Sequence, residues 1–341
     1  MWAAWTVLLL AAQPGTDFEK LETGHLKNIR QVTFGFVRAG EGYFSPDGKH
    51  IIFQAEEKGD NPFYQMFVQN LETGKFHRVS PGIGKTTCGY FSPDGKKIIF
   101  ASSHLDPEAK KHYAAEKELR EQEKATKKRR RYAWDFDPHM EIFESNLDGS
   151  NLKRLTNSPG YDAEGSFSPD GKQIVFCSNR GGKDNLELYI MDADGGNVRQ
   201  LTKASGCYNG GPFFSPDGKR VIFRSDRKKK DHLQLYVINV DGTGERALTD
   251  DQDWVFWAPF WYKDSQHIVY TAADHSNPTA RPNYDVYWRN IDNDAKPIRL
   301  TFAPGADVLP VFNSDGTKLM WTSVRGGNPY PQLFIADFTR P

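Results

Sequence analysis

The segment YFSPDGKHIIF (residues 43–53) decides the fold, because close copies of it occur five more times along the 341-residue chain. The copies read YFSPDGKKIIF (90–100), SFSPDGKQIVF (166–176), FFSPDGKRVIF (213–223), FWYKDSQHIVY (260–270) and VFNSDGTKLMW (311–321). Their turn aspartates are separated by 47, 76, 47, 47 and 51 residues, so one insertion of about 29 residues explains the longest interval. A regular period of this length indicates a repeat architecture.

Each repeat predicts four short antiparallel strands. A Pro-Asp-Gly turn, or its equivalent, joins a strand that ends in aromatic residues to one rich in β-branched residues. An alternating segment such as QMFVQN (65–70) or ELYIMD (187–192) predicts the third strand, and a tight turn such as LDGSN (147–151) leads to the fourth. Six such units predict an all-β, six-bladed β-propeller.

The two ends of the chain predict how the ring closes. The sixth repeat reaches its third strand, QLFIADF (332–338), without a fourth, whereas LETGHLKNIRQVTF (21–34) matches LETGKFHRVS (71–80) of the first repeat. We therefore expect the N-terminal strand to complete the sixth blade, which removes an exposed sheet edge. This predicts a single propeller domain over residues 21–341, with residues 104–139 as a loop inserted in the second blade.

Composition limits the classes of partner. The 44 basic and 44 acidic residues balance, so no global field favours nucleic acid. Three cysteines without a CxxC pair argue against a disulfide scaffold or a Cys-based zinc site. The apolar run at residues 1–15 is too short to span a bilayer and is typical of a signal peptide, or alternatively of an apolar tail. We expect a periplasmic or secreted monomer.

At this point the repeats resemble a known family. Units of the form FSPDGKxIxF…LYxxNxDG…RLT are similar to those of the six-bladed propeller of the periplasmic TolB family, and the resemblance covers residues 21–338. It implies the fold. For function it implies less, because such propellers serve as binding platforms, as envelope-complex components and as gating domains of prolyl-oligopeptidase-type hydrolases. We expect neither the N-terminal α/β domain of TolB nor a downstream hydrolase domain, and the sequence contains no GxSxG or HExxH motif.

Function is expected where the repeats differ, on the face that carries the long loops. Carboxylates that belong to single blades are predicted at the mouth of the central channel: Glu41, Asp162, Glu164 and Asp307. Converging carboxylates repel one another unless a cation neutralises them, so Ca²⁺ or a cationic ligand is one hypothesis. The alternative is that they pair with Arg38 or Lys85, or stay hydrated.

The fourth and fifth blades offer different chemistry at the same mouth. Their candidate residues are Tyr208, Asn209, Trp254, Phe256 and Trp257. Aromatic rings suit stacking on a sugar or an apolar side chain, and core packing is the alternative. Ten residues after the turn aspartate, three blades carry an arginine (Arg180, Arg227 and Arg325), which we expect to brace neighbouring blades.

The insertion adds a charged helix and a cluster of ligand-type residues. The segment PEAKKHYAAEKELREQEKATKKRRRY (107–132) predicts a helix that projects from the loop face or packs lightly over it. Its basic run could hold an anionic lipid, glycan or protein, or form a solvated face: Lys127, Lys128, Arg129, Arg130 and Arg131.

The clustered ligand-type residues at the two ends of the inserted loop are His104, Asp135, Asp137 and His139. On an extended segment the last three point to one side, which would allow a metal site or a polar rim for a ligand. Hydrogen bonds that pin the loop are the alternative.

Three functions follow as hypotheses. The first is a non-catalytic platform that binds a protein, peptide or glycan of the cell envelope at the channel mouth. The second is a metal-dependent lyase or hydrolase acting on a glycan or peptide at the same face, with the residues of the inserted loop beside the channel acids. The third is an envelope-complex component that docks through the charged helix.

Overall fold

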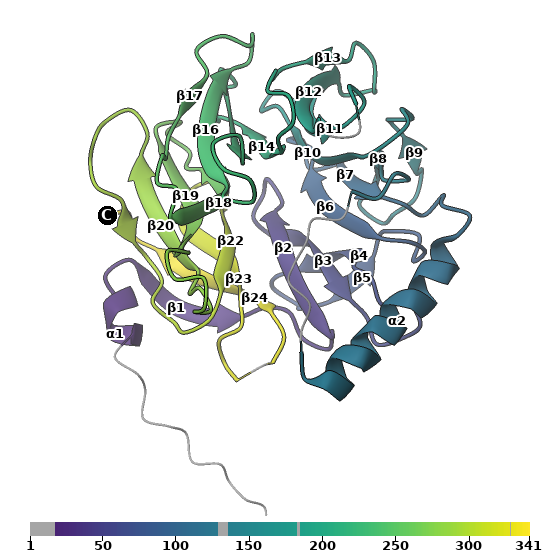
Figure 1. Cartoon of the computed structure of the whole chain (residues 1–341), viewed down its shortest axis with the longest axis horizontal. Coiled ribbons are helices and arrows are strands. Elements are labelled where there is room, and N and C mark those ends of the chain that lie inside the picture. The colour runs from purple at the N-terminus through teal and green to yellow at the C-terminus, as the bar shows by residue number, and fades with distance from the viewer. Residues whose placement is uncertain (1–17, 129–135, 183–184, 328) are drawn as a thin grey trace, which may run out of the picture.

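The computed structural model describes residues 18–128, 136–182, 185–327 and 329–341. Within them, six four-stranded antiparallel sheets surround a central axis as the blades of a propeller (Figure 1). The first two blades contain β2 (Arg38–Phe44), β3 (His50–Glu56), β4 (Gln65–Asn70) and β5 (Phe76–Arg78), then β6 (Thr86–Phe91), β7 (Lys97–Ser102), β8 (Glu141–Asn146) and β9 (Lys153–Arg154).

The next two blades contain β10 (Asp162–Phe167), β11 (Gln173–Ser178), β12 (Glu187–Asp192) and β13 (Arg199–Gln200), then β14 (Asn209–Phe214), β15 (Arg220–Ser225), β16 (Gln234–Asn239) and β17 (Arg246–Ala247). The last two contain β18 (Trp254–Trp261), β19 (His267–Asp274), β20 (Asp285–Asn290) and β21 (Ile298–Arg299), then β22 (Asp307–Phe312), β23 (Lys318–Ser323), β24 (Gln332–Phe338) and β1 (Leu26–Gln31). Both the fold class and the order of strands predicted from the repeats are confirmed.

The N-terminal strand closes the ring as expected. β1 pairs antiparallel with β24, with Leu26 opposite Phe338 and Arg30 opposite Ile335. A short helix, α1 (Phe18–Glu22), precedes this strand. Because β1 occupies the outer position of the sixth blade, the third strand of that blade is paired on both sides.

The repeated turns stabilise themselves locally. The Ser45 hydroxyl donates to Asp47 Oδ1 over 2.6 Å, and the backbone N–H of Lys49 donates to the same oxygen over 3.0 Å. These bonds hold the pKa of Asp47 below its ordinary value. The same arrangement recurs at Ser92 and Asp94. The repeated phrase therefore encodes turn geometry rather than a binding site.

The core lies between neighbouring blades. Ile52 and Phe53 of β3 are fully buried, as is Met320 of β23. The inner strands approach their neighbours so closely that a Cβ at Gly42 would lie 2.7 Å from Leu333 of the sixth blade. Glycine in β2 thus allows the first and sixth blades to pack.

The insertion forms α2 (Ala109–Thr126), which lies along the outside of the first two blades in Figure 1. The helix predicted for this segment is confirmed. In the part of the chain described here, no helix has the length and apolar character needed to cross a membrane.

Candidate functional site

The inner strand of every blade carries a bulge at the same place. Strand register shifts at this point in all six blades. The residue six positions before each turn aspartate has a positive φ, between 45° and 58°: Glu41, Cys88, Glu164, Gly211, Ala258 and Leu309. A bulge bends a strand and changes the direction of a side chain. All six residues line one central cavity.

The cavity has a volume of about 930 Å³ and reaches from the bulges to the loop face. At the opposite end, four aromatic rings from the inner strands fill the axis: Tyr43, Tyr90, Phe213 and Phe260. The rings of Tyr43 and Phe213 lie 5.6 Å apart although they belong to the first and fourth blades, on opposite sides of the ring. The channel is therefore a blind pocket with an aromatic floor.

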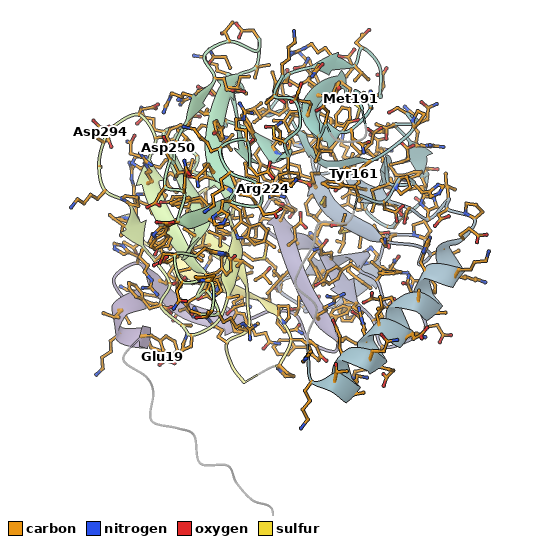
Figure 2. The ribbon with its side chains drawn as sticks, viewed as in Figure 1. Glu19, Tyr161, Met191, Arg224, Asp250 and Asp294 are labelled. Atoms are coloured by element: carbon orange, nitrogen blue, oxygen red, sulfur yellow. The ribbon has the colours of Figure 1, made fainter. Side chains whose placement is uncertain are left out.

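One wall of the pocket is a buried ion pair. Arg224 on β15 lies near the middle of the ring of blades (Figure 2), and its Nη2 is 3.0 Å from Glu164 Oε2. The Tyr208 hydroxyl lies 2.7 Å from the same nitrogen and donates to Glu164. Burial opposes the charge on Arg224, but Tyr208 and Glu164 outweigh it and raise the pKa of the guanidinium. The sequence analysis placed Glu164 and Tyr208 at the mouth but missed Arg224.

On the other side of the pocket, Glu41 has weaker partners. Its Oε1 accepts a hydrogen bond from the Tyr43 hydroxyl at 3.3 Å, while the Glu41 backbone N–H donates to Thr322. Burial raises the pKa of Glu41, and the nearby charge of Glu164 raises it further. Across the described ranges, no lysine, arginine or histidine forms a salt bridge with Glu41.

Two carboxylates expected at the mouth lie elsewhere. Asp162 pairs with Arg180 at 2.9 Å and Asp307 with Arg325 at 2.6 Å, and both carboxylates are buried within their blades rather than lining the cavity. Asn209 is buried likewise and accepts a hydrogen bond from Arg227.

The recurring arginines correct a second expectation. Each of the pairs above joins the inner strand of a blade to the loop after the second strand of that same blade. Arg180, Arg227 and Arg325 therefore brace their own blades, not neighbouring ones. Arg325 also contacts the N-terminal segment, where its Nη1 lies 3.0 Å from Glu22 Oε2.

Aromatic residues of the fifth blade divide between pocket and core. Trp257 lines the cavity, with the Arg224 guanidinium 5.7 Å from its ring centroid. Its indole Nε1 is buried and makes no hydrogen bond among the described residues. Trp254 and Phe256 stack on one another and pack against the core of the fourth and fifth blades. Stacking chemistry in the pocket thus rests on Trp257.

The inserted helix contributes to the rim. Glu116 and Glu123 of α2 line the cavity. Arg120 holds the helix in place, because it donates to Glu116, to Glu56 of β3 and to the backbone oxygen of Pro62. The Tyr113 hydroxyl accepts a hydrogen bond from the backbone N–H of Gly84 at 2.6 Å. The helix therefore packs over the first blade through specific polar contacts.

The ligand-type residues of the inserted loop are held separately. Asp137 pairs with Lys85 at 3.1 Å, and the ring of His104 packs on Phe143 with centroids 4.3 Å apart. His139 follows a turn at Pro138, so it does not share an extended segment with Asp137 as predicted. Its Nε2 lies 3.7 Å from Asp106 Oδ1.

Asp135 and the basic residues Arg129, Arg130 and Arg131 lie outside the described residues, whereas Lys127 and Lys128 follow α2 on the exposed surface. Among the residues that the structure places, no group of three His, Cys, Asp or Glu side chains is arranged to hold a metal ion.

The residues that sequence reasoning missed are Arg224, Glu22 and Asp106. Of these, only Arg224 could have been identified from the sequence, because it is the one charged residue seven positions after a turn aspartate. The other five blades have uncharged residues there: Gln54, Ala101, Cys177, Thr271 and Thr322. The Asp106 carboxylate contacts two histidines: its Oδ2 lies 3.2 Å from His112 Nε2, and its Oδ1 lies 3.7 Å from His139 Nε2.

Comparison with known proteins agrees with this architecture. A family model for the TolB β-propeller domain matches residues 132–208. The Tol-Pal system protein TolB of Bordetella pertussis is 46% identical over 50 residues, which are 15% of this chain and 11% of that protein. The matched segment thus spans about a ninth of the relative's length.

Solved structures extend the likeness to the whole ring. A putative TolB from Agrobacterium tumefaciens superposes with a TM-score of 0.59 at 19% identity, covering 89% of this chain and 91% of that one. An oligogalacturonate lyase from Vibrio parahaemolyticus gives a TM-score of 0.53 at 14% identity, covering 91% and 93%. Identities this low establish the fold alone.

Proposed function

We propose that this chain, a TolB-like six-bladed β-propeller, is a non-catalytic binding protein of the cell envelope that holds part of a protein, peptide or glycan in its central pocket. The blind pocket carries the proposal. Four aromatic rings close one end of it, and loops of the first, second and sixth blades together with α2 form its rim. A site closed at its floor holds a side chain or a chain end rather than passing a ligand through.

The size and walls of the pocket support binding. A volume of about 930 Å³ lies within the range of small-molecule sites. Val308, Leu309 and Pro310 provide an apolar wall, while Glu41 and the Glu164–Arg224 pair provide fixed polar groups. Apolar walls with a few placed polar groups are typical of ligand pockets.

An envelope location is supported by relatives that belong to the Tol-Pal system. Because the matched segment of the relative is short, its partners are not transferred to this chain. We place the protein in the periplasm or outside the cell, with residues 21–341 as one propeller domain. The third hypothesis joins the first here: since Glu116 and Glu123 line the pocket, α2 would contact a ligand seated at the mouth.

A peptide selection tests the proposal. A displayed random-peptide library, with a glycan array beside it, is screened against the wild-type protein and against Leu309→Trp, which fills the pocket from a position that already carries a large side chain. The matched control is Leu152→Trp, at an exposed leucine beside β9 on the opposite face. We expect ligands that bind the wild type and Leu152→Trp but not Leu309→Trp. Equal binding by all three proteins would exclude the pocket, and turnover of oligogalacturonate would contradict a non-catalytic role.

A further inference from the structure

We propose that the pocket selects an organic cation, the alkylammonium group of a lysine side chain or of a free diamine, and that Glu41 receives the charge. This deepens the proposed function and rests on it. The charged end of the ligand would meet Glu41 beside the aromatic floor, and its methylene groups would lie along Val308, Leu309 and Pro310.

The charge balance inside the pocket leaves one carboxylate to be matched. Glu164 and Arg224 neutralise each other at 3.0 Å. Glu41 has the Tyr43 hydroxyl at 3.3 Å and no ion pair within the described part of the chain. A carboxylate in a poorly solvated site is costly unless a cation pairs with it. The inner pocket is thus complementary to one positive charge.

The fold does not require a carboxylate at position 41. The same bulge holds Cys88, Ala258 and Leu309 in other blades, all with positive φ. A thiol, a methyl group and an isobutyl group therefore satisfy the backbone equally well. Only the first and third blades place a carboxylate at this position, and that of the third, Glu164, is paired with Arg224. The role of Glu41 is therefore sought in binding rather than in architecture.

The surroundings of Glu41 suit an organic cation better than a metal ion. Ca²⁺ takes six to eight oxygen ligands, whereas the Cys88 thiol hydrogen-bonds Glu41 and the neighbouring wall of the cavity includes Leu309. An ammonium group needs only three acceptors, and its aliphatic stem gains from apolar walls.

The charged side chains of the rim are held by partners. Glu116 and Glu123 of α2 face the cavity. The two basic residues that line the rim already have carboxylate partners, Arg38 with Glu56 at 2.8 Å and Lys85 with Asp137 at 3.1 Å. Glu116 is paired in the same way, with Arg120 at 2.7 Å. The carboxylate that a cation entering the pocket would meet is therefore Glu41.

Calorimetric titration of the full chain tests the inference. The probes are N-acetyl-lysine methylamide, its uncharged analogue N-acetyl-norleucine methylamide, cadaverine and Ca²⁺. We expect the lysine probe to bind at least about tenfold more tightly than the norleucine probe, and Glu41→Gln to abolish that difference. Glu41→Asp, which keeps the charge, should retain part of it. The control Glu72→Gln, at an exposed glutamate on the opposite face, should leave it intact.

The outcomes separate the possible sources of the cation and separate this inference from the proposed function. Tighter binding of the lysine probe than of cadaverine supports a peptide source, and the reverse supports a free diamine. Equal binding of lysine and norleucine probes, or Glu41-dependent binding of Ca²⁺ alone, would overturn the inference. If ligands sensitive to Leu309→Trp are found but are indifferent to Glu41→Gln, the proposed function stands and the cation inference fails.

Discussion

Glu164 and Arg224 form an ion pair that joins the third blade to the fourth, with both side chains buried and 3.0 Å between Oε2 and Nη2. Removing one partner from such a pair leaves an uncompensated charge in a poorly solvated site. We therefore expect Arg224→Met to lower the free energy of unfolding by about 3–5 kcal/mol, measured by urea denaturation.

Two further variants make this measurement decisive. Lys228→Met removes an exposed partner of Asp250 and should cost less than about 1 kcal/mol. The double variant Glu164→Gln/Arg224→Met should recover part of the loss, because no unpaired charge remains. A double variant no more stable than Arg224→Met would show that packing around Tyr208, and not charge pairing, dominates at this site.

The raised pKa of Glu41 predicts how stability depends on pH. Because folding raises this pKa above the ordinary value of 4.5, the ionised carboxylate disfavours the folded state once the pH exceeds that value. Glu41→Gln should therefore raise Tm by about 2–4 °C near pH 7.5. Below about pH 4 the glutamate is neutral in both states, so the difference should vanish. A stabilisation that persists at low pH would point to a cause other than charge.

The N-terminal segment is fastened by Glu22, which accepts hydrogen bonds from Arg325 and from the backbone N–H of Phe302. Glu22→Gln should lower the free energy of unfolding by about 2 kcal/mol, the value of a hydrogen bond to a charged group. It should also speed amide hydrogen exchange in β1. Glu19→Gln, at an exposed position of the same helix, is the control. Unchanged exchange in β1 would mean that the pairing of β1 with β24 suffices to close the ring.

Much of this fold could be predicted from sequence, because six copies of one turn phrase report the same local structure. The match of residues 21–34 to residues 71–80 also predicted how β1 closes the ring. Both predictions depend on local patterns that repeat.

The candidate site was harder to predict, for a geometric reason. Asp162 and Glu164 are two residues apart and would point to the same side of a regular strand. The bulge between Ala163 and Ser166 breaks that alternation, so Glu164 faces the cavity while Asp162 turns to Arg180. No sequence pattern marks the bulge, because glutamate, cysteine, alanine and leucine all occupy its positive-φ position.

The metal hypothesis for the inserted loop has a direct test. Asp137 is held by Lys85, and His104 packs on Phe143, so two of the four candidate ligands already have other partners. We expect the purified protein to carry less than about 0.1 equivalent of zinc, manganese or calcium by elemental analysis, and chelation to leave Tm unchanged. One equivalent of bound metal that is lost in the His139→Ala variant would support a metal site in the inserted loop.

The inserted helix should be separable from the propeller. Arg120 and Tyr113 attach α2 through bonds to Glu56, Pro62 and Gly84, and the helix buries little apolar surface of its own. Arg120→Ala combined with Tyr113→Phe should therefore speed hydrogen exchange in α2 at least about tenfold, because local opening would cost less.

Since the six blades keep their own contacts, Tm of the propeller should fall by no more than about 4 °C in this variant. Lys110→Ala, at an exposed position of the same helix, should change neither the exchange rate nor Tm.

If α2 also guides ligands to the pocket, deletion of residues 107–131 should weaken capture of any ligand found by selection while the propeller stays folded. The deleted segment carries ten lysine and arginine residues and five glutamates, so the loss of its net positive field should weaken capture of acidic ligands most, and that loss should shrink as salt screens the attraction. A loss of basic ligands would instead report direct contact with Glu116 and Glu123, which line the rim. Capture that is unaffected by the deletion would remove α2 from the binding site and leave the pocket to the blades alone.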